Sequence, residues 1–148
     1  MALLRYDECM DDSTYSPQKI VIVEDNYPLA DIYKTRLEMI GYECHSAFDG
    51  ASGLALIERI KPDLVLLDLM VPRIAGDEIL RRMRESDWGK RIRVFIISNL
   101  NEADAPAGLR DLGIEGYAVK ANLSNDDIDK LVDRILTPKG QDEPVTLE

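Results

Sequence analysis

The sequence predicts an α/β protein in which five helices cover both faces of a doubly wound parallel sheet, with its five strands in the order 2-1-3-4-5. Short apolar segments alternate five times with segments of helical periodicity, which is typical of such a sheet. One apolar segment, residues 63–68, holds four consecutive apolar residues and suits a strand covered on both faces. Four of the predicted strands end in polar side chains, at the edge where open α/β sheets place their ligands.

The first part of the chain supplies two strands with a helix between them. Residues 19–24 form the first strand, and residues 42–47, which are more polar, form an edge strand. The helix spans residues 27–40 and ends at Gly41. Its apolar residues recur at helical spacing and are expected to be buried. They are Leu29, Ile32, Tyr33, Leu37 and Ile40.

Two further helices flank the buried strand over residues 63–68. The helix before this strand spans residues 50–60, and Pro62 ends it. The helix after it follows a loop over residues 71–76. Both helices carry inward apolar positions. These are Leu54, Ile57, Ile60, Ile79, Leu80 and Met83.

The last part of the chain predicts strands over residues 92–98 and 115–119. The helix between them is the weakest in the chain, because Pro106 and Gly108 lie in or near its first turn. Ser124 is a candidate cap for the final helix. That helix places its apolar residues on one stripe. They are Ile128, Leu131, Val132, Ile135 and Leu136.

Length and composition narrow the class of protein. The chain has 148 residues, the length of one domain, and a net charge of −10, which disfavours direct nucleic-acid binding. No apolar run reaches the length of a membrane span, and the acidic N-terminus lacks a signal peptide. Cys9 and Cys44 are expected to be free thiols in a reducing compartment. We expect a cytoplasmic protein with an N-terminal extension (1–17), a folded domain (18–137) and a tail (138–148).

Three carboxylates follow the first and third strands. Glu24 and Asp25 end the first strand, and Asp68 ends the third. Two such charges about 4 Å apart repel by roughly 4 kcal/mol at an effective dielectric constant near 20, so a cation or a proton is needed to offset the repulsion. Mg²⁺ prefers a few carboxylates together with water and a substrate phosphate. The cluster therefore predicts a magnesium site.

Asp68 is a candidate nucleophile beside that site, because carboxylates attack phosphorus to form acyl phosphates. The fourth and fifth strands end in Ser98 and Lys120, which are able to contact phosphoryl oxygens. Each residue alone has a simpler interpretation: a solvated lysine, a turn serine, or an acid or Asn26 capping the next helix. The joint placement of these groups at four strand ends favours a phosphoryl site.

These residues resemble the landmarks of the receiver domain of two-component response regulators. The resemblance covers residues 18–137 and rests on the runs 23–26 (VEDN) and 67–76 (LDLMVPRIAG), and on Ile97-Ser98 and Tyr117-Ala-Val-Lys120. The aspartate followed by proline four residues later and glycine eight residues later is a specific signature. The resemblance implies a flavodoxin-like, three-layer sandwich.

The resemblance also implies a role for each residue. Asp68 would take a phosphoryl group from a histidine of a sensor kinase or a phosphotransfer protein. Mg²⁺ would be bound by Asp25 and Asp68, by Glu24 directly or through water, and by the Met70 backbone carbonyl. Ser98 and Lys120 would contact the phosphoryl group, and Ser98 and Tyr117 would act as switch residues. Such a domain is a signalling module rather than an enzyme, with at most slow autophosphatase activity.

The sequence departs from the family pattern at two positions. Ala121 stands where a proline after a cis bond is usual, so the Lys120–Ala121 bond is either trans or strained. Asn99 stands where a small residue is usual. Two positions that tune the lifetime of the phosphoryl group, Met70 and Leu100, are apolar and cannot orient an attacking water. We expect slow self-dephosphorylation.

About a dozen polar residues follow Leu136, which suggests a stand-alone receiver. It would signal to an unknown downstream protein, or to a second copy of itself, through the face formed by the fourth helix, fifth strand and fifth helix. Two alternatives stay open. One is a phosphate-independent interaction module, favoured by Ala121 and Asn99. The other is an aspartyl-phosphate phosphatase of the haloacid-dehalogenase type, which would have a second acid at position 70.

Overall fold

A computed structural model describes residues 16–137 of the chain. Five parallel strands form one sheet in the order β2-β1-β3-β4-β5, as predicted. The strands are β1 (Lys19–Val23), β2 (Glu43–Ala47), β3 (Leu64–Leu67), β4 (Arg93–Ser98) and β5 (Gly116–Val119). The helices are α1 (Tyr27–Met39), α2 (Gly50–Ile60), α3 (Gly76–Glu85) and α4 (Asn125–Leu136).

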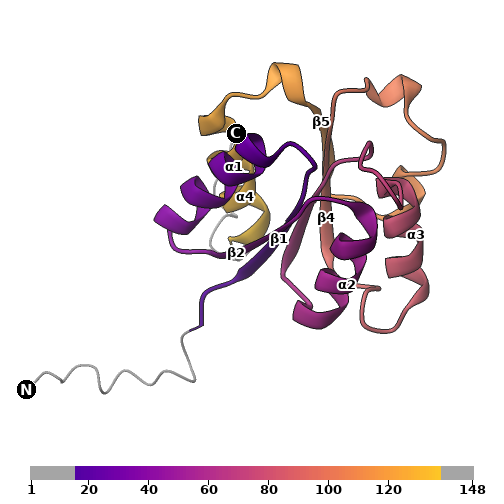
Figure 1. Ribbon diagram of the computed structural model, residues 1–148, viewed down its shortest axis with the longest axis horizontal. Coiled ribbons are helices and arrows are strands. Elements are labelled where there is room, and N and C mark those ends of the chain that lie inside the picture. Colours follow the sequence, from indigo (N-terminus) through magenta and orange to yellow (C-terminus); the bar gives the residue numbers. More distant parts are fainter. Residues whose placement is uncertain (1–15, 138–148) are drawn as a thin grey trace, which may run out of the picture.

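The helices form two layers, with α1 and α4 on one face of the sheet and α2 and α3 on the other (Figure 1). Alternate residues of each strand point to opposite faces, so each strand contributes to both cores. In β1, Ile20 and Ile22 pack beneath α1 and α4, whereas Val21 and Val23 pack beneath α2 and α3. All four residues of β3 are buried, as expected for the central strand of a covered sheet.

The predicted helix between β4 and β5 is the one element that the structure contradicts. Residues 99–113 contain two 3₁₀ turns, η2 (Glu102–Asp104) and η3 (Arg110–Leu112), and no α-helix. Pro106 lies between these turns, and Gly108 has a φ of +87°, which an α-helix cannot contain. The described residues therefore hold four α-helices instead of five, and α4 is the final helix.

Side chains of the segment 99–113 hold it against the domain without a helix. Leu109 is buried in the core beneath α2 and α3. Across the chain reversal, the guanidinium group of Arg110 donates two hydrogen bonds to the Glu102 carboxylate, at 2.6 and 2.8 Å. Both of these side chains are exposed, so the pair contributes little stability. Arg84 also donates hydrogen bonds to the Leu112 and Gly113 carbonyls, at 2.6 and 3.1 Å, so the segment is anchored more firmly at its end than at its start.

Two glycines position the loop that follows β3. The Gly50 N–H donates to the Pro72 carbonyl at 2.8 Å, and the Gly76 N–H donates to the Leu69 carbonyl at 3.0 Å. A Cβ at Gly50 would overlap the Ile74 carbonyl group, and a Cβ at Gly76 would lie 2.7 Å from the Leu69 Cα atom. Both contacts are with backbone, so relief would require the loop to move.

The substitution Gly50→Ala is expected to lower the free energy of unfolding by about 2–3 kcal/mol, because the new methyl group forces the loop away from α2. Chemical denaturation of the purified variant measures this loss. The neighbouring substitution Ala51→Ser, at an exposed position of the same helix turn, serves as the control and should change little. An unchanged unfolding free energy for Gly50→Ala would show that the loop yields freely.

The cap of the last helix and the state of one cysteine agree with the sequence-based expectations. Ser124 caps α4 in a capping box with Asp127. Cys44 is a free, buried thiol, whereas Cys9 lies outside the described residues, as do the tail over 138–148 and most of the extension over 1–17. Among the described residues, no helix has the length and apolarity that crossing a membrane requires.

Candidate functional site

The site lies where β1 and β3 end. The backbone N–H of Glu24 donates to the Ala47 carbonyl, and that of Asp68 donates to the Val23 carbonyl, each at 3.0 Å. These bonds extend the sheet pairing by one residue and fix both carboxylates at the same edge. Glu24 and Asp68 are only 2% and 4% exposed.

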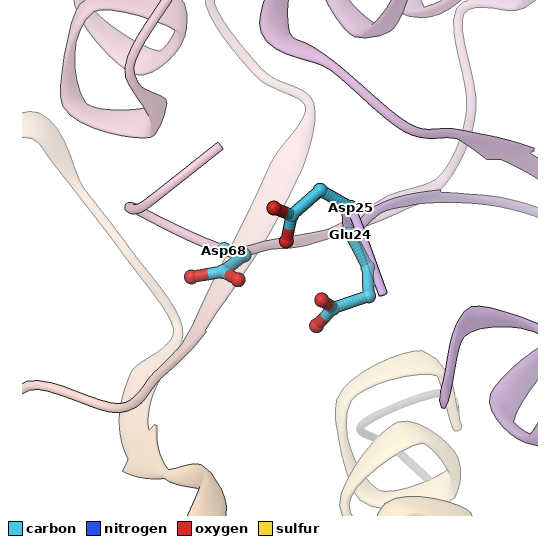
Figure 2. Close-up of side chains that lie close together, drawn as sticks. All are labelled: Glu24, Asp25 and Asp68. Carbon is cyan, nitrogen blue, oxygen red and sulfur yellow. The ribbon is translucent and has the colours of Figure 1, made fainter. Parts of the chain in front are cut away.

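Asp25 completes an acidic cluster with these two residues. One carboxylate oxygen from each of Glu24, Asp25 and Asp68 lies within 4.8 Å of the others. Figure 2 shows the three side chains gathered at the ends of the two strands, with Asp25 on the exposed side. Asn26, the residue after Asp25, caps α1, because its Oδ1 atom accepts a hydrogen bond from the Leu29 N–H at 3.0 Å. Capping of α1 thus leaves the Asp25 carboxylate available to the cluster.

Lys120 contacts both buried acids. Its Nζ atom lies 2.7 Å from Glu24 Oε1 and 2.7 Å from Asp68 Oδ2. Lys120 begins the 3₁₀ turn η4 (Lys120–Asn122) directly after β5, and its side chain reaches across the ends of the intervening strands. Because the described residues contain no cis peptide bond, the Lys120–Ala121 bond is trans. The lysine reaches Asp68 without the cis bond that is usual in the family.

Burial shifts the pKa values of Glu24 and Lys120. Burial raises the pKa of Glu24 above its usual value, and the contact with Lys120 and the N–H of Asn26 oppose this shift only in part. Burial alone would lower the pKa of Lys120, but its contacts with Asp68 and Glu24 outweigh that effect and raise it. The ammonium group is therefore charged at neutral pH and partly neutralises two buried carboxylates.

Met70 contacts the site through its backbone. Its N–H donates to Asp68 Oδ1 at 3.0 Å, while its side chain is 55% exposed. The family resemblance implied a role for the Met70 carbonyl and did not include this N–H contact. The bond leaves Oδ1 tied to the loop and Oδ2 tied to Lys120, which fixes the plane of the Asp68 carboxylate.

Ser98 and Tyr117 converge on the backbone of Leu100. The fully buried Ser98 Oγ accepts a hydrogen bond from the Leu100 N–H at 3.2 Å, and the Tyr117 hydroxyl donates to the Leu100 carbonyl at 2.8 Å. Burial is the main reason that the pKa of Tyr117 is raised. Sequence reasoning treated Leu100 only as an apolar side chain, and a backbone role leaves no trace in residue type. The Leu100 backbone therefore links Ser98 and Tyr117 to the start of the segment 99–113.

The donor set fits a hard divalent cation. Three carboxylates supply oxygen ligands without closing a cage, which leaves coordination positions for water and a phosphoryl oxygen, as Mg²⁺ prefers. Glu24, Asp25 and Asp68 are the residues placed to hold the ion. Bound Mg²⁺ would neutralise negative charge that gathers during phosphoryl transfer.

Comparison with known proteins is consistent with this geometry. The chain is 32% identical over 102 residues to the DNA-binding dual master transcriptional regulator RpaA of Synechocystis sp., a match that covers 69% of this chain and 42% of that protein. The chain spans less than half the length of the curated relatives that it matches.

Solved structures share the fold. The chemotaxis response regulator CheY4 of Vibrio cholerae superposes with a TM-score of 0.74 at 21% identity, over 82% of this chain and 100% of that one. The receiver domain of the sensor histidine kinase PA1611 from Pseudomonas aeruginosa, with a magnesium ion in its active site cleft, gives a TM-score of 0.69 at 23% identity, over 83% and 100%. The family description "response regulator receiver domain" matches residues 20–134, and the chain belongs to this family.

Proposed function

We propose that this receiver domain accepts a phosphoryl group on Asp68 from a phosphohistidine of a sensor kinase or phosphotransfer protein, with Mg²⁺ bound by Glu24, Asp25 and Asp68. The observation that carries the proposal is the acidic cluster, in which one oxygen of each of the three carboxylates lies within 4.8 Å of the others. The Lys120 ammonium group contacts two of these carboxylates. The magnesium ion in the PA1611 receiver domain supports the choice of cation.

In the transfer reaction, a carboxylate oxygen of Asp68 attacks phosphorus. The phosphorus–nitrogen bond of the donor breaks, the imidazole leaves with the bonding pair and takes a proton, and an acyl phosphate forms on Asp68. Oδ2 is the oxygen that Lys120 now contacts, at 2.7 Å. In the proposal, the Lys120 ammonium group transfers its hydrogen bond from this oxygen to a phosphoryl oxygen. It thus balances the negative charge of the newly attached phosphoryl group.

The proposed output is a rearrangement of the segment 99–113. The Ser98 hydroxyl would turn toward the phosphoryl group and lose its bond with the Leu100 N–H, and Tyr117 would lose its anchor on the Leu100 carbonyl. Beyond Leu100, the first part of the segment is held mainly by the exposed Glu102–Arg110 ion pair. Its end is held by Leu109 and by hydrogen bonds from Arg84 to the Leu112 and Gly113 carbonyls. A local charge event would thus bias a weakly held element, which a downstream protein or a second copy would read together with β5 and α4.

Amide hydrogen exchange tests this output. With beryllofluoride and Mg²⁺, we expect exchange within residues 99–113 to change by at least about tenfold, while the amides of β1 and β3 stay protected. Mass spectrometry of peptides covering the two regions measures the difference. Identical exchange in residues 99–113 with and without the phosphate mimic would contradict the proposed output.

The phosphorylated state is expected to be long-lived. The exposed side chain of Met70 and the partly buried side chain of Leu100 have no group that orients an attacking water. We expect Met70→Glu, which supplies a carboxylate at an exposed position, to speed loss of the phosphoryl group by about tenfold or more. Met70→Leu is the matched control. Intact-mass measurements over time give both rates, and equal rates for the two variants would contradict this reasoning.

Phosphorylation by acetyl phosphate tests the acceptor function without the cognate kinase. The protein is expected to gain the mass of one phosphoryl group in the presence of Mg²⁺ and to gain none when the metal is chelated. If the gain is the same with and without Mg²⁺, the metal role is wrong. If the mass does not increase and Mg²⁺ does not bind, the protein acts as a phosphate-independent interaction module. Lys120 would then stay paired with Glu24 and Asp68.

The setting of this reaction forms part of the proposal. We place it in the cytoplasm, which agrees with the unpaired Cys44 thiol. The absence of a nucleic-acid contact stays a prediction that depends on the net charge of −10, and the relative RpaA is named as a DNA-binding regulator.

A further inference from the structure

A second polar site lies at the opposite edge of the sheet, where β3 and β4 begin. A groove of about 590 Å³ there is lined by the indole of Trp88 and by cationic side chains. The cationic residues are Lys61, Lys90, Arg91 and Arg93. We call this site the basic groove. The proposed phosphorylation chemistry makes no use of it.

The groove has a surplus of positive charge. It contains two acidic residues, and Asp63 Oδ2 already accepts the Lys19 backbone N–H at 2.7 Å. Asp87 is fully exposed and pairs loosely with Lys90 at 3.3 Å. Among residues 16–137, Arg91 has no carboxylate partner, and Arg93 donates only to the Ile135 carbonyl at 3.3 Å. A locally basic groove in a chain of net charge −10 favours an acidic occupant.

The N-terminal part of the same chain contains an acidic segment that is a candidate ligand for the basic groove. Residues 7–12 contain four carboxylates and no lysine or arginine, with the acids at Asp7, Glu8, Asp11 and Asp12. The chain enters the fold at Lys19, whose backbone N–H and carbonyl both bond to Asp63 in the groove wall. Asp12 is seven residues from this point, and a chain of that length spans at most about 25 Å.

We infer that the acidic segment 7–12 binds in the basic groove of its own chain. Single exposed ion pairs are weak, so binding requires several of them together. The short tether supplies this opportunity, because tethered groups meet at an effective concentration in the millimolar range. Binding would depend strongly on salt, and it would close the groove to other acidic ligands.

The chain contains its own pair of probes for this contact. Trp88 is the only tryptophan and lies in the groove, and Cys9 lies within the acidic segment. The other cysteine, Cys44, is 3% exposed, and burial raises the pKa of its thiol to about 12, so it reacts slowly. A fluorescence acceptor on Cys9 therefore reports its distance from Trp88 through energy transfer. A Cys9→Ser sample treated in the same way gives the background.

Energy transfer is expected to be high in about 0.1 M salt and to fall to less than about half in about 1 M salt, where the Debye length shrinks from about 10 Å to about 3 Å. The double variant Lys90→Gln/Arg91→Gln should show the low value at both salt concentrations. The matched control is Arg59→Gln/Lys130→Gln, which removes the same charge from exposed positions elsewhere and should behave as the wild type.

Three results would overturn the inference. The first is transfer that neither salt nor Lys90→Gln/Arg91→Gln changes. The second is transfer that falls on dilution, because a second copy would then supply the segment. The third is low transfer in the wild type that rises in Asp142→Asn/Glu143→Gln, because the acidic C-terminal tail would then be the occupant. Far-UV circular dichroism of each variant confirms that the fold is intact.

Discussion

The substitution Asp68→Asn is expected to abolish phosphorylation by acetyl phosphate. An amide has no anionic oxygen with which to attack phosphorus, so no acyl phosphate forms. The replacement has nearly the same shape, and the Met70 N–H can still donate to the oxygen at the Oδ1 position. Intact-mass spectrometry should show one added phosphoryl group on the wild type and none on the variant under the same conditions.

The control for this prediction is Asp104→Asn, which makes the same chemical change at an exposed position outside the acidic cluster. It should be phosphorylated as the wild type is. A phosphoryl group on Asp68→Asn at the wild-type level would mean that another residue is the acceptor, and the proposed function of Asp68 would be wrong.

The substitution Lys120→Gln is expected to lower the free energy of unfolding by about 3 kcal/mol at pH 7 without Mg²⁺. Its ammonium group contacts two buried carboxylates, and removing one partner of a buried ion pair typically costs about 3–5 kcal/mol. The lower end applies because the lysine side chain is 13% exposed. Urea denaturation measures the loss, with Lys130→Gln, an exposed lysine of α4, as the control.

This loss should depend on pH in a defined direction. The pKa of Glu24 is raised above its unfolded value of 4.5, so the folded state holds its proton more tightly. Stability from this group is fully present below pH 4.5 and is lost as pH rises through the folded pKa. Removing Lys120 raises that pKa further, so Lys120→Gln should be more destabilising at pH 8 than at pH 5.

Two further measurements separate this cause from a simple packing defect. The double variant Lys120→Gln/Glu24→Gln should recover part of the lost stability, because one of the two unpaired charges is gone. Mg²⁺ should also reduce the loss, because Lys120 competes with the ion for Glu24 and Asp68 in the wild type, so the ion stabilises the variant more. Equal losses at pH 5 and pH 8, with no recovery in the double variant, would contradict the electrostatic explanation.

The strands of the sheet were predictable because each corresponds to a short run of neighbouring residues in the sequence. The runs 19–24 and 63–68 are apolar without interruption, and strands buried on both faces require such runs. The helix between β4 and β5 was wrongly predicted, although Pro106 and Gly108 already argued against it. Ile32 in α1 and Ile40 at its C-terminal cap were expected to be buried but are 40% and 46% exposed. A helix on one face of a sheet buries a narrower stripe, and Ile40 lies beyond the last helical residue.

The internal contacts of the candidate site were less predictable than its residue types. Strand ends alone indicated that Glu24, Asp25 and Asp68 would meet, and the structure brings them together. The contact of Lys120 with Glu24 depends on how a long side chain crosses from β5 to β1, which sequence spacing does not determine. The two hydrogen bonds on the Leu100 backbone are likewise formed by atoms that every residue has.

The double contact of Lys120 has a consequence for a cell that is short of divalent cations. The buried acids keep a positively charged partner whether or not an ion is available. If phosphorylation needs Mg²⁺ as proposed, shortage of the metal would stop it while the fold keeps this ion pair. The inactive molecules would form a reserve that regains competence as soon as the ion returns.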